Sequence, residues 1–202
     1  MSSIDNLTEY FSKFPGIGAR QARRFVYFLL QSNHQFTDNL SKEITQLKKN
    51  IRQCSHCYRY FEGSSPACSL CDTLPQKTKI LVVVEKDPDL DAIQKTNTHY
   101  GHYFVLGGLL PLSDKKNVSL RINEFLKKIE HEALNGELEE IVFALSANPE
   151  GDLTVHHLKG LLQPLTKKYS LKMTTLGRGL STGTELEYSD EETIKNALEN
   201  RK

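Results

Sequence analysis

The sequence of 202 residues lacks three features that would assign a chain to a class at once. No apolar run approaches the ~18 residues that a membrane-spanning helix needs, so nothing suggests a membrane protein. The first residues, MSSIDNLTEYFSKF, lack the charged and apolar regions of a secretory signal, and we therefore expect a protein of the reducing cytosol. The chain also has no internal repeat and no low-complexity segment, and its length suits one medium or two small domains.

Cysteine is absent from most of the chain but occurs four times in one short window, as Cys54-x2-Cys57-x10-Cys68-x2-Cys71. Two such pairs offer four thiolates that can close into a tetrahedron around one Zn²⁺ ion. Because four cysteine ligands leave no open position for a water or a substrate, we expect this single ion to be structural. Two structural disulfides are the alternative, and a reducing compartment disfavours them.

The net charge is only +1, but the charges are unevenly distributed along the chain. Residues 1–71 carry nine Lys/Arg and five Asp/Glu, a balance of +4, whereas residues 72–202 carry seventeen and twenty, a balance of −3. A polyanionic partner is therefore plausible, and we expect it to contact the N-terminal third.

Hydrophobic periodicity divides the chain into a helical start and an alternating remainder. Helical spacing of apolar residues covers 5–31 and 38–52, and the first of these stretches is interrupted by a turn at residues 14–18. After the cysteines, the run Ile80-Leu-Val-Val-Val84 is typical of a strand buried on both faces. Strands are expected at 80–85, 102–106, 140–146 and 169–176, and helices at 89–96, 119–134, 152–166 and 190–200. This alternation predicts an α/β domain with a mainly parallel sheet flanked by helices.

The turn Phe14-Pro-Gly-Ile-Gly18 has the composition of a phosphate-binding hairpin. Without a Cβ at Gly16 and Gly18, a phosphate oxygen can approach the backbone amides at the start of the next helix, whose dipole favours an anion. Arg20 and Arg24 lie four residues apart on one side of that helix and can reach the same strand. An ordinary turn with solvated arginines is the alternative. We expect a helix-hairpin-helix that binds DNA independently of its sequence.

The order of these parts resembles the RecR family of bacterial recombination mediators. The segment from Phe14 to Arg24 is similar to the family's hairpin, usually Leu-Pro-Gly-x-Gly-Pro-Lys, with Arg20 at the lysine position and Arg24 at the arginine position. The chain differs from the family at Ala19, where the family has proline, and in the ten-residue spacing between the cysteine pairs. Further stretches resemble family motifs: Tyr100-Gly-His-Tyr-Phe-Val-Leu-Gly-Gly108, Asn148-Pro-Glu-Gly-Asp152, and Gly177-Arg-Gly-Leu-Ser-Thr-Gly183 with Leu186-Glu-Tyr-Ser-Asp190.

The resemblance implies a chain of four parts. These are a helix-hairpin-helix DNA-binding region (1–53), a four-cysteine zinc finger (54–71), a Toprim-type α/β domain (78–175), and a C-terminal Walker B-like segment with a helix (176–202). It also implies a bacterial, cytoplasmic, nucleoid-associated protein that assembles into a homo-oligomer, a tetrameric ring clamp. Such a clamp acts with RecO and RecF to load recombinase at gaps where single-stranded and double-stranded DNA meet.

The Toprim resemblance raises the question of catalysis, since Toprim enzymes hold Mg²⁺ with a glutamate and an Asp-x-Asp pair at the ends of two strands. Glu85 fits the first position, but the later strand and its end, residues 141–148, contain no acidic residue. We therefore expect no enzymatic activity and no catalytic residue. Glu85, Glu150 and Asp152 are instead expected near the carboxyl ends of the strands, as a docking surface for RecO.

Asp87, Asp89 and Asp91 follow Glu85 and could add carboxylates to a metal site. We interpret them as residues of a turn and of the start of a helix. Two other functions remain open from the sequence: a metal-dependent Toprim enzyme acting on nucleic acid, and a zinc-stapled protein-interaction module that does not contact DNA.

Overall fold

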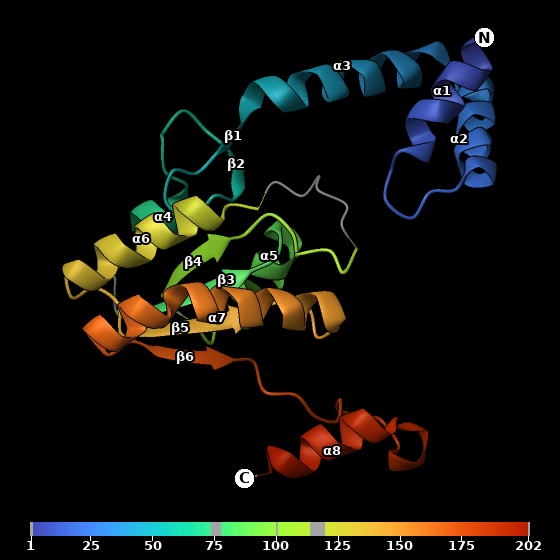
Figure 1. Cartoon of the computed structure of the whole chain (residues 1–202). Helices are drawn as coiled ribbons and strands as arrows, with labels where there is room; N and C mark the ends of the chain where they lie inside the picture. Colours follow the sequence, from blue (N-terminus) through green and yellow to red (C-terminus); the bar gives the residue numbers. More distant parts are fainter. Residues whose placement is uncertain (1, 74–77, 100, 114–119, 202) are drawn as a thin grey trace. The chain divides into compact units, whose positions relative to one another are not determined.

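The computed structural model describes residues 2–73, 78–99, 101–113 and 120–201 (Figure 1). The chain separates into two compact units, Met1–Arg52 and Gln53–Lys202, each with its own packing. Tyr100 of the family-like stretch and residue 119, where a helix was expected to begin, lie outside the described residues. None of the described helices combines the length and the apolar composition that crossing a membrane requires.

The N-terminal unit consists of α1 (Ser3–Ser12), α2 (Ala19–Gln31) and α3 (His34–Asn50). The first two helices pack against each other: the rings of Phe11 and Phe25 meet edge to face at 5.7 Å, and Ala22 and Val26 are buried. The third helix begins earlier than predicted because the Asn33 side chain accepts a hydrogen bond from the Phe36 amide and caps it. It ends before residue 52, where the backbone becomes extended.

A small module carrying the cysteines follows. Its strands β1 (Ile51–Gln53) and β2 (Tyr60–Glu62) pair in a two-stranded sheet, and the short helix α4 (Ser69–Thr73) carries the last cysteine. The turn at residues 55–57 contains the second cysteine and is followed by Tyr58, whose φ is 63°. A bulky residue adopts this left-handed conformation only under local constraint.

The larger unit contains a four-stranded sheet, and all its pairings are parallel, which confirms the predicted mainly parallel sheet. The strand order is β4-β3-β5-β6, so β4 and β6 form the edges. Each strand is shorter than expected, because the residues at its ends belong to the connecting loops. The strands are β3 (Ile80–Val84), β4 (His102–Val105), β5 (Glu140–Ala144) and β6 (Lys172–Thr175).

Alternation of side chains along the strands builds a core on each face of this sheet. On one face, Leu81, Val83 and Phe104 pack with α6 (Ile122–Leu134) and α7 (Pro149–Tyr169). On the other, strand residues pack with α5 (Asp87–Lys95) and with three of the cysteines. The strand residues that belong to this second core are Val82, Val84, Tyr103, Val105 and Ala144. The cysteine module is therefore part of the layer that covers the sheet.

The seventh helix is longer than the predicted 152–166 at both ends. Asn148 caps its start by accepting a hydrogen bond from the Gly151 amide at 2.8 Å, and Pro149 takes the first helical position. At the other end Ser170 has a φ of 56°, so the helix stops there and the predicted strand 169–176 begins only at Lys172.

The C-terminal segment contains a single turn of 3-10 helix, η1 (Leu186–Tyr188), and the helix α8 (Glu191–Glu199). Asp190 caps α8 by accepting a hydrogen bond from the Thr193 amide at 2.8 Å, so the helix begins one residue after the predicted start at residue 190. The Asn200 side chain donates to the Arg178 carbonyl at 3.0 Å, so the segment folds back on its own beginning.

Candidate nucleic-acid interface and metal centre

The hairpin between α1 and α2 presents an open backbone. Ile17 donates its amide to the Phe14 carbonyl at 3.0 Å, and Gly16 has a φ of 75°, a conformation that favours glycine. Gly18 is the N-cap of α2 and makes no side-chain capping bond, so the first amides of the helix are left without that partner. A Cβ at either glycine would meet nothing within 4 Å. The turn therefore has both uncapped amides and the space for an anion.

The two predicted DNA-binding arginines lie on the exposed side of α2. Ala22 and Val26 face the core of the unit, whereas Arg20 and Arg24 are exposed. Within the described parts of the chain, neither guanidinium lies within ion-pair distance of a carboxylate; Arg24 contacts only the Gln21 amide oxygen, at 3.4 Å. Both charges are thus available for a phosphate at one end of this helix.

The neighbouring Arg23, unlike Arg20 and Arg24, has a carboxylate partner. It pairs with Asp5 of α1 at 3.4 Å, and this contact helps to join the two helices. The hairpin therefore contains one structural arginine beside two arginines with open guanidinium groups, a distinction that the spacing of the sequence does not reveal.

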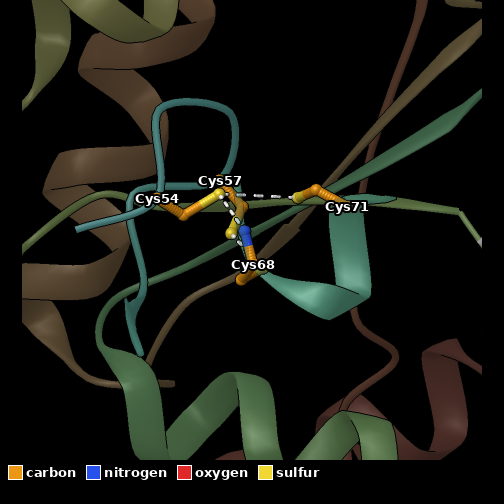
Figure 2. Close-up of side chains that lie close together, drawn as sticks. All are labelled: Cys54, Cys57, Cys68 and Cys71. Carbon is orange, nitrogen blue, oxygen red and sulfur yellow. Dashed lines mark hydrogen bonds between the residues drawn. The ribbon is translucent and has the colours of Figure 1, made fainter. Parts of the chain in front are cut away.

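The four cysteines converge on one point, as Figure 2 shows. All four Sγ atoms lie within 4.8 Å of one another, with Cys54 and Cys71 at 3.8 Å and Cys57 and Cys68 at 3.7 Å. No disulfide joins these four cysteines. A tetrahedron of thiolates at about 2.3 Å from a central zinc has edges of roughly 3.8 Å, so these sulfur positions fit the ion.

Hydrogen bonds to sulfur also favour a cation at the centre of the cluster, while the pKa values of its thiols diverge. The amides of His56 and Cys68 donate to the Cys54 sulfur at 3.4 and 3.3 Å, which stabilises a thiolate. The hydrogen bond with Cys71 lowers the pKa of Cys57 to about 5, whereas burial raises the pKa of Cys68 to about 11. A divalent ion that replaces the retained protons would hold four thiolates and offset half of their negative charge.

The cysteine module is fastened to the sheet by specific contacts. The Val105 amide at the outer edge of β4 donates to the Cys57 carbonyl at 2.8 Å. Arg59 pairs with Asp91 of α5 at 3.0 Å, and the Tyr60 amide donates to Asp87 at 2.6 Å. Asp89 accepts from the Lys86 amide at 3.1 Å and caps α5. These aspartates thus have structural roles, and two of them anchor the module rather than only starting a helix.

Glu85 lies directly after β3, at the predicted carboxyl end of the strand, and is half-buried. Its Oε2 atom accepts a hydrogen bond from Ser146 at 2.6 Å, and its Oε1 atom lies 3.5 Å from the Lys86 ammonium group. Ser146 follows the adjacent strand β5, so a hydroxyl faces Glu85 at that strand end. Within the described residues, the four cysteines form the only cluster of His, Cys, Asp or Glu that could hold a metal ion.

Glu150 and Asp152 lie in the first turn of α7, where acidic residues are favoured by the helix dipole. Asp152 pairs with Arg178 through both carboxylate oxygens, one of them at 3.2 Å, and this contact joins the C-terminal segment to α7. No hydrogen bond or ion pair links Glu85 to either residue in the described parts of the chain. The docking surface expected from these three residues stays a prediction.

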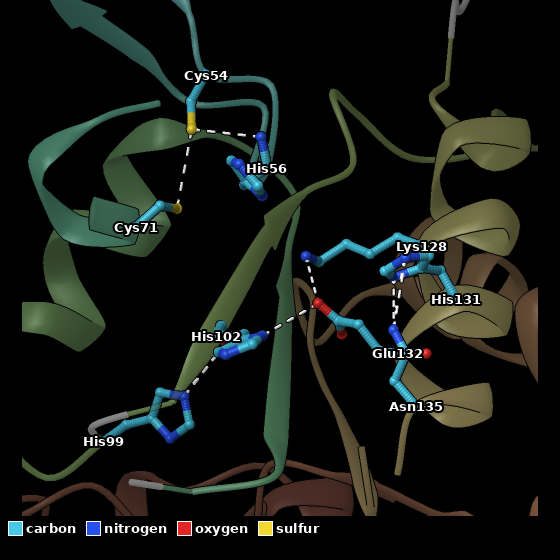
Figure 3. Close-up of polar contacts among 9 residues, drawn as sticks. All are labelled: Cys54, His56, Cys71, His99, His102, Lys128, His131, Glu132 and Asn135. Carbon is cyan, nitrogen blue, oxygen red and sulfur yellow. Dashed lines mark hydrogen bonds and ion pairs between the residues drawn. The ribbon is translucent and has the colours of Figure 1, made fainter. Parts of the chain in front are cut away.

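The sequence interpretation missed a buried polar group beside the cysteine module. Glu132 of α6 is almost completely buried and contacts Lys128 and His102, as Figure 3 shows. The four-residue spacing of Lys128 and Glu132 is a signal of an ion pair, but such pairs are normally solvent-exposed. Only the fold reveals that this one is enclosed by the edge of the sheet.

Comparison with known proteins places these parts in one family. The matching family models are the RecR helix-hairpin-helix at residues 4–48, a Toprim domain at 79–175 and the RecR C-terminal region at 179–202. Similar full-length proteins share the description Recombination protein RecR. The one from Chloroherpeton thalassium is 32% identical over 200 residues, which cover 98% of this chain and 96% of the relative. The relative from Dehalococcoides mccartyi is 33% identical, and the match covers 98% of this chain and 93% of the relative. The relative from Bifidobacterium longum is 34% identical, and the match covers 99% of this chain and 96% of the relative.

Proposed function

Because this chain belongs to the RecR family of recombination proteins, we propose that it is a recombination mediator in DNA repair that binds DNA through its N-terminal hairpin. The observation that carries the proposal is the hairpin geometry: helix-start amides without a capping side chain lie next to two exposed arginines. Amides and guanidinium groups in this arrangement contact sugar-phosphate chains and read no base sequence.

The mild net charge agrees with a clamp better than with a single tight site. A ring holds DNA by enclosure, and several weak phosphate contacts on one assembly act together through their high effective concentration. In this proposal four copies form the ring and present their hairpins to the DNA. With RecO and RecF, the ring loads recombinase at gaps between single-stranded and double-stranded DNA. Its place of action is the cytoplasm, at the nucleoid.

The cysteine centre holds one structural Zn²⁺ in this proposal. Cys54, Cys57, Cys68 and Cys71 would be its ligands, and the bound ion would supply a cross-link between the two halves of the module. Because the module shares its core with the strands, the ion also stabilises one face of the Toprim domain.

The protein would act through binding and have no catalytic residue of its own. Glu85 is the carboxylate that matches the Toprim arrangement, and it is engaged by the Ser146 hydroxyl. Glu85, Glu150 and Asp152 are proposed as the docking surface for RecO, since acidic groups at this edge of the sheet are half-buried or exposed.

The hairpin is tested by measuring DNA affinity as a function of salt for the Arg20→Ala/Arg24→Ala variant. Binding should weaken to a similar degree for all sequences, and the slope of log affinity against log salt should flatten by about one unit for each lost contact. Lys167→Ala/Lys168→Ala removes the same charge from an exposed pair at the end of α7 and serves as the control. Equal losses in both variants would indicate a general charge effect and reject the hairpin.

A further inference from the structure

A cavity of about 640 Å³ lies where the cysteine module, the edge strand β4 and α6 meet. Its volume falls within the range of roughly 300–1,000 Å³ that is usual for small-molecule sites. One face of α6 supplies part of its wall through Glu124, Lys127, Lys128 and His131, which follow a helical spacing. His56 of the cysteine module also belongs to the lining.

Glu132 lines the cavity and carries an unfilled hydrogen-bond acceptor. The residue is 6% exposed. Its Oε1 atom accepts from Lys128 Nζ at 2.6 Å and from His102 Nδ1 at 3.1 Å (Figure 3). Its Oε2 atom is buried and has no partner among the described residues. A buried carboxylate oxygen without a donor is costly, so a ligand that donates a hydrogen bond would gain from meeting it.

The charges around Glu132 select the kind of donor. Burial raises the pKa of Glu132, but the hydrogen bond from His102 and the charge of Lys128 outweigh that effect and lower it overall. The carboxylate is thus ionised at neutral pH, and the Lys128 ammonium group already balances its charge. At this carboxylate a second cation would be repelled by Lys128, whereas a neutral N–H donor would not; Glu124 and Glu137 add carboxylates at other positions of the lining.

The remaining lining suits a flat, polar heterocycle. The rings of His56, Tyr58 and Tyr103 border the cavity, and the exposed His56 ring offers a surface for stacking. The Tyr103 hydroxyl is also buried without a partner among the described residues, so a second polar group of the lining residues lacks a hydrogen bond. Lys127 is exposed at the cavity wall, where its ammonium group can meet an anion.

We propose that this cavity binds a nucleobase that carries an amino group, with Glu132 Oε2 accepting from that group and Lys127 contacting the attached phosphate. Adenine, cytosine and guanine have such a group, whereas thymine presents carbonyl oxygens on both sides of its single N–H donor. The base could come from a free nucleotide or from an unpaired nucleotide of bound DNA. The second source rests on the proposed DNA-binding function, and the first does not.

The test is a calorimetric titration of the full-length, zinc-loaded protein with the four deoxynucleoside monophosphates. Those of adenine, cytosine and guanine should bind saturably, and thymidine monophosphate should bind at least about tenfold more weakly, because it loses a hydrogen bond to a charged acceptor. Glu132→Gln should remove this preference, whereas Glu130→Gln, an exposed residue of the same helix outside the cavity lining, should preserve it.

Lys127→Ala provides a second variant that does not disturb a buried group. It should weaken binding of deoxyadenosine monophosphate but leave binding of deoxyadenosine, which has no phosphate, unchanged. Equal affinity for all four nucleotides, no saturable binding at millimolar concentration, or an unchanged preference in Glu132→Gln would each overturn the proposal.

Single-stranded oligonucleotides of adenine or thymine, equal in length, identify the source of the base. An adenine preference that disappears in Glu132→Gln assigns the cavity to unpaired DNA, whereas a preference confined to mononucleotides assigns it to free nucleotides. The two proposals of this protein's function can also fail separately. DNA binding that depends on Arg20 and Arg24 without any base preference rejects the cavity alone, and nucleotide binding without DNA binding rejects the hairpin alone.

Discussion

At the scale of single residues, similar side chains in this protein have different roles because their surroundings differ. Arg23 is paired with Asp5, while Arg20 and Arg24 of the same helix have no carboxylate partner in the described structure. Glycines differ in the same way: Gly16 and Gly18 border open space, whereas Gly151 lies under a neighbouring carbonyl. Residue type and spacing predicted the hairpin glycines and arginines as a group, but only the packing separates structural from open positions.

Gly151 gives a residue-level prediction. A Cβ at this position would lie 1.9 Å from the Ser146 carbonyl oxygen, so Gly151→Ala must displace the loop that ends β5 and starts α7. We expect a loss of about 1–3 kcal/mol in the free energy of unfolding, as for other overpacked sites, measured by urea denaturation. The control is Gly160→Ala in the same helix, where a Cβ meets nothing within 4 Å.

Gly160→Ala should leave the protein as stable as the parent or raise its unfolding free energy by up to about 1 kcal/mol, since alanine is the better helix former. If the two variants were equally stable, the close approach of Gly151 to Ser146 would not exist in the folded protein.

At the scale of elements, the sequence predicted which segments form strands and helices better than it predicted their ends. The buried run at residues 80–84 and the alternation after it indicated the parallel sheet, because period and composition are local properties. The early start of α7 depends on the Asn148 cap, and its late end depends on the left-handed Ser170. The side chain of Glu132 was not predicted to be buried, since its enclosure requires β4 and α6 to meet, and these are distant in the sequence.

The cysteine module gives the element-level prediction. Its cysteines share a core with Val82, Val84 and Leu90, so losing the metal should also loosen the sheet face beneath it. We expect Cys71→Ser, or removal of the ion with a chelator, to lower the melting temperature by roughly 10 °C. Losing the ion should cost several kcal/mol of unfolding free energy, and each kcal/mol lowers the melting temperature of a chain of this size by about 2–4 °C. Thermal unfolding followed by circular dichroism, with metal content from elemental analysis, measures both effects.

Glu62→Gln is the matched control for that experiment, because Glu62 is an exposed residue of the same module that is not part of the cysteine cluster. It should retain the metal and the melting temperature of the parent. If the metal-free protein had the same melting temperature as the parent, the cysteines would not form a structural centre.

At the scale of the whole molecule, the chain combines two compact units with different chemistry. The N-terminal unit carries the hairpin and all of the excess positive charge, while the larger unit carries the cysteine centre, the sheet and the acidic strand ends. This division, with the proposed phosphate contacts in one unit and the proposed partner and ligand sites in the other, agrees with the proposed role of a mediator between DNA and other proteins.

The most direct measurement is an NMR titration of the isotope-labelled protein with a DNA duplex that has a single-stranded gap, observing backbone amides. The largest shifts should fall on the amides from Gly16 to Arg24, should not depend on DNA sequence, and should diminish as salt rises. Unchanged hairpin amides, with DNA-induced shifts confined to the sheet domain, would contradict the account.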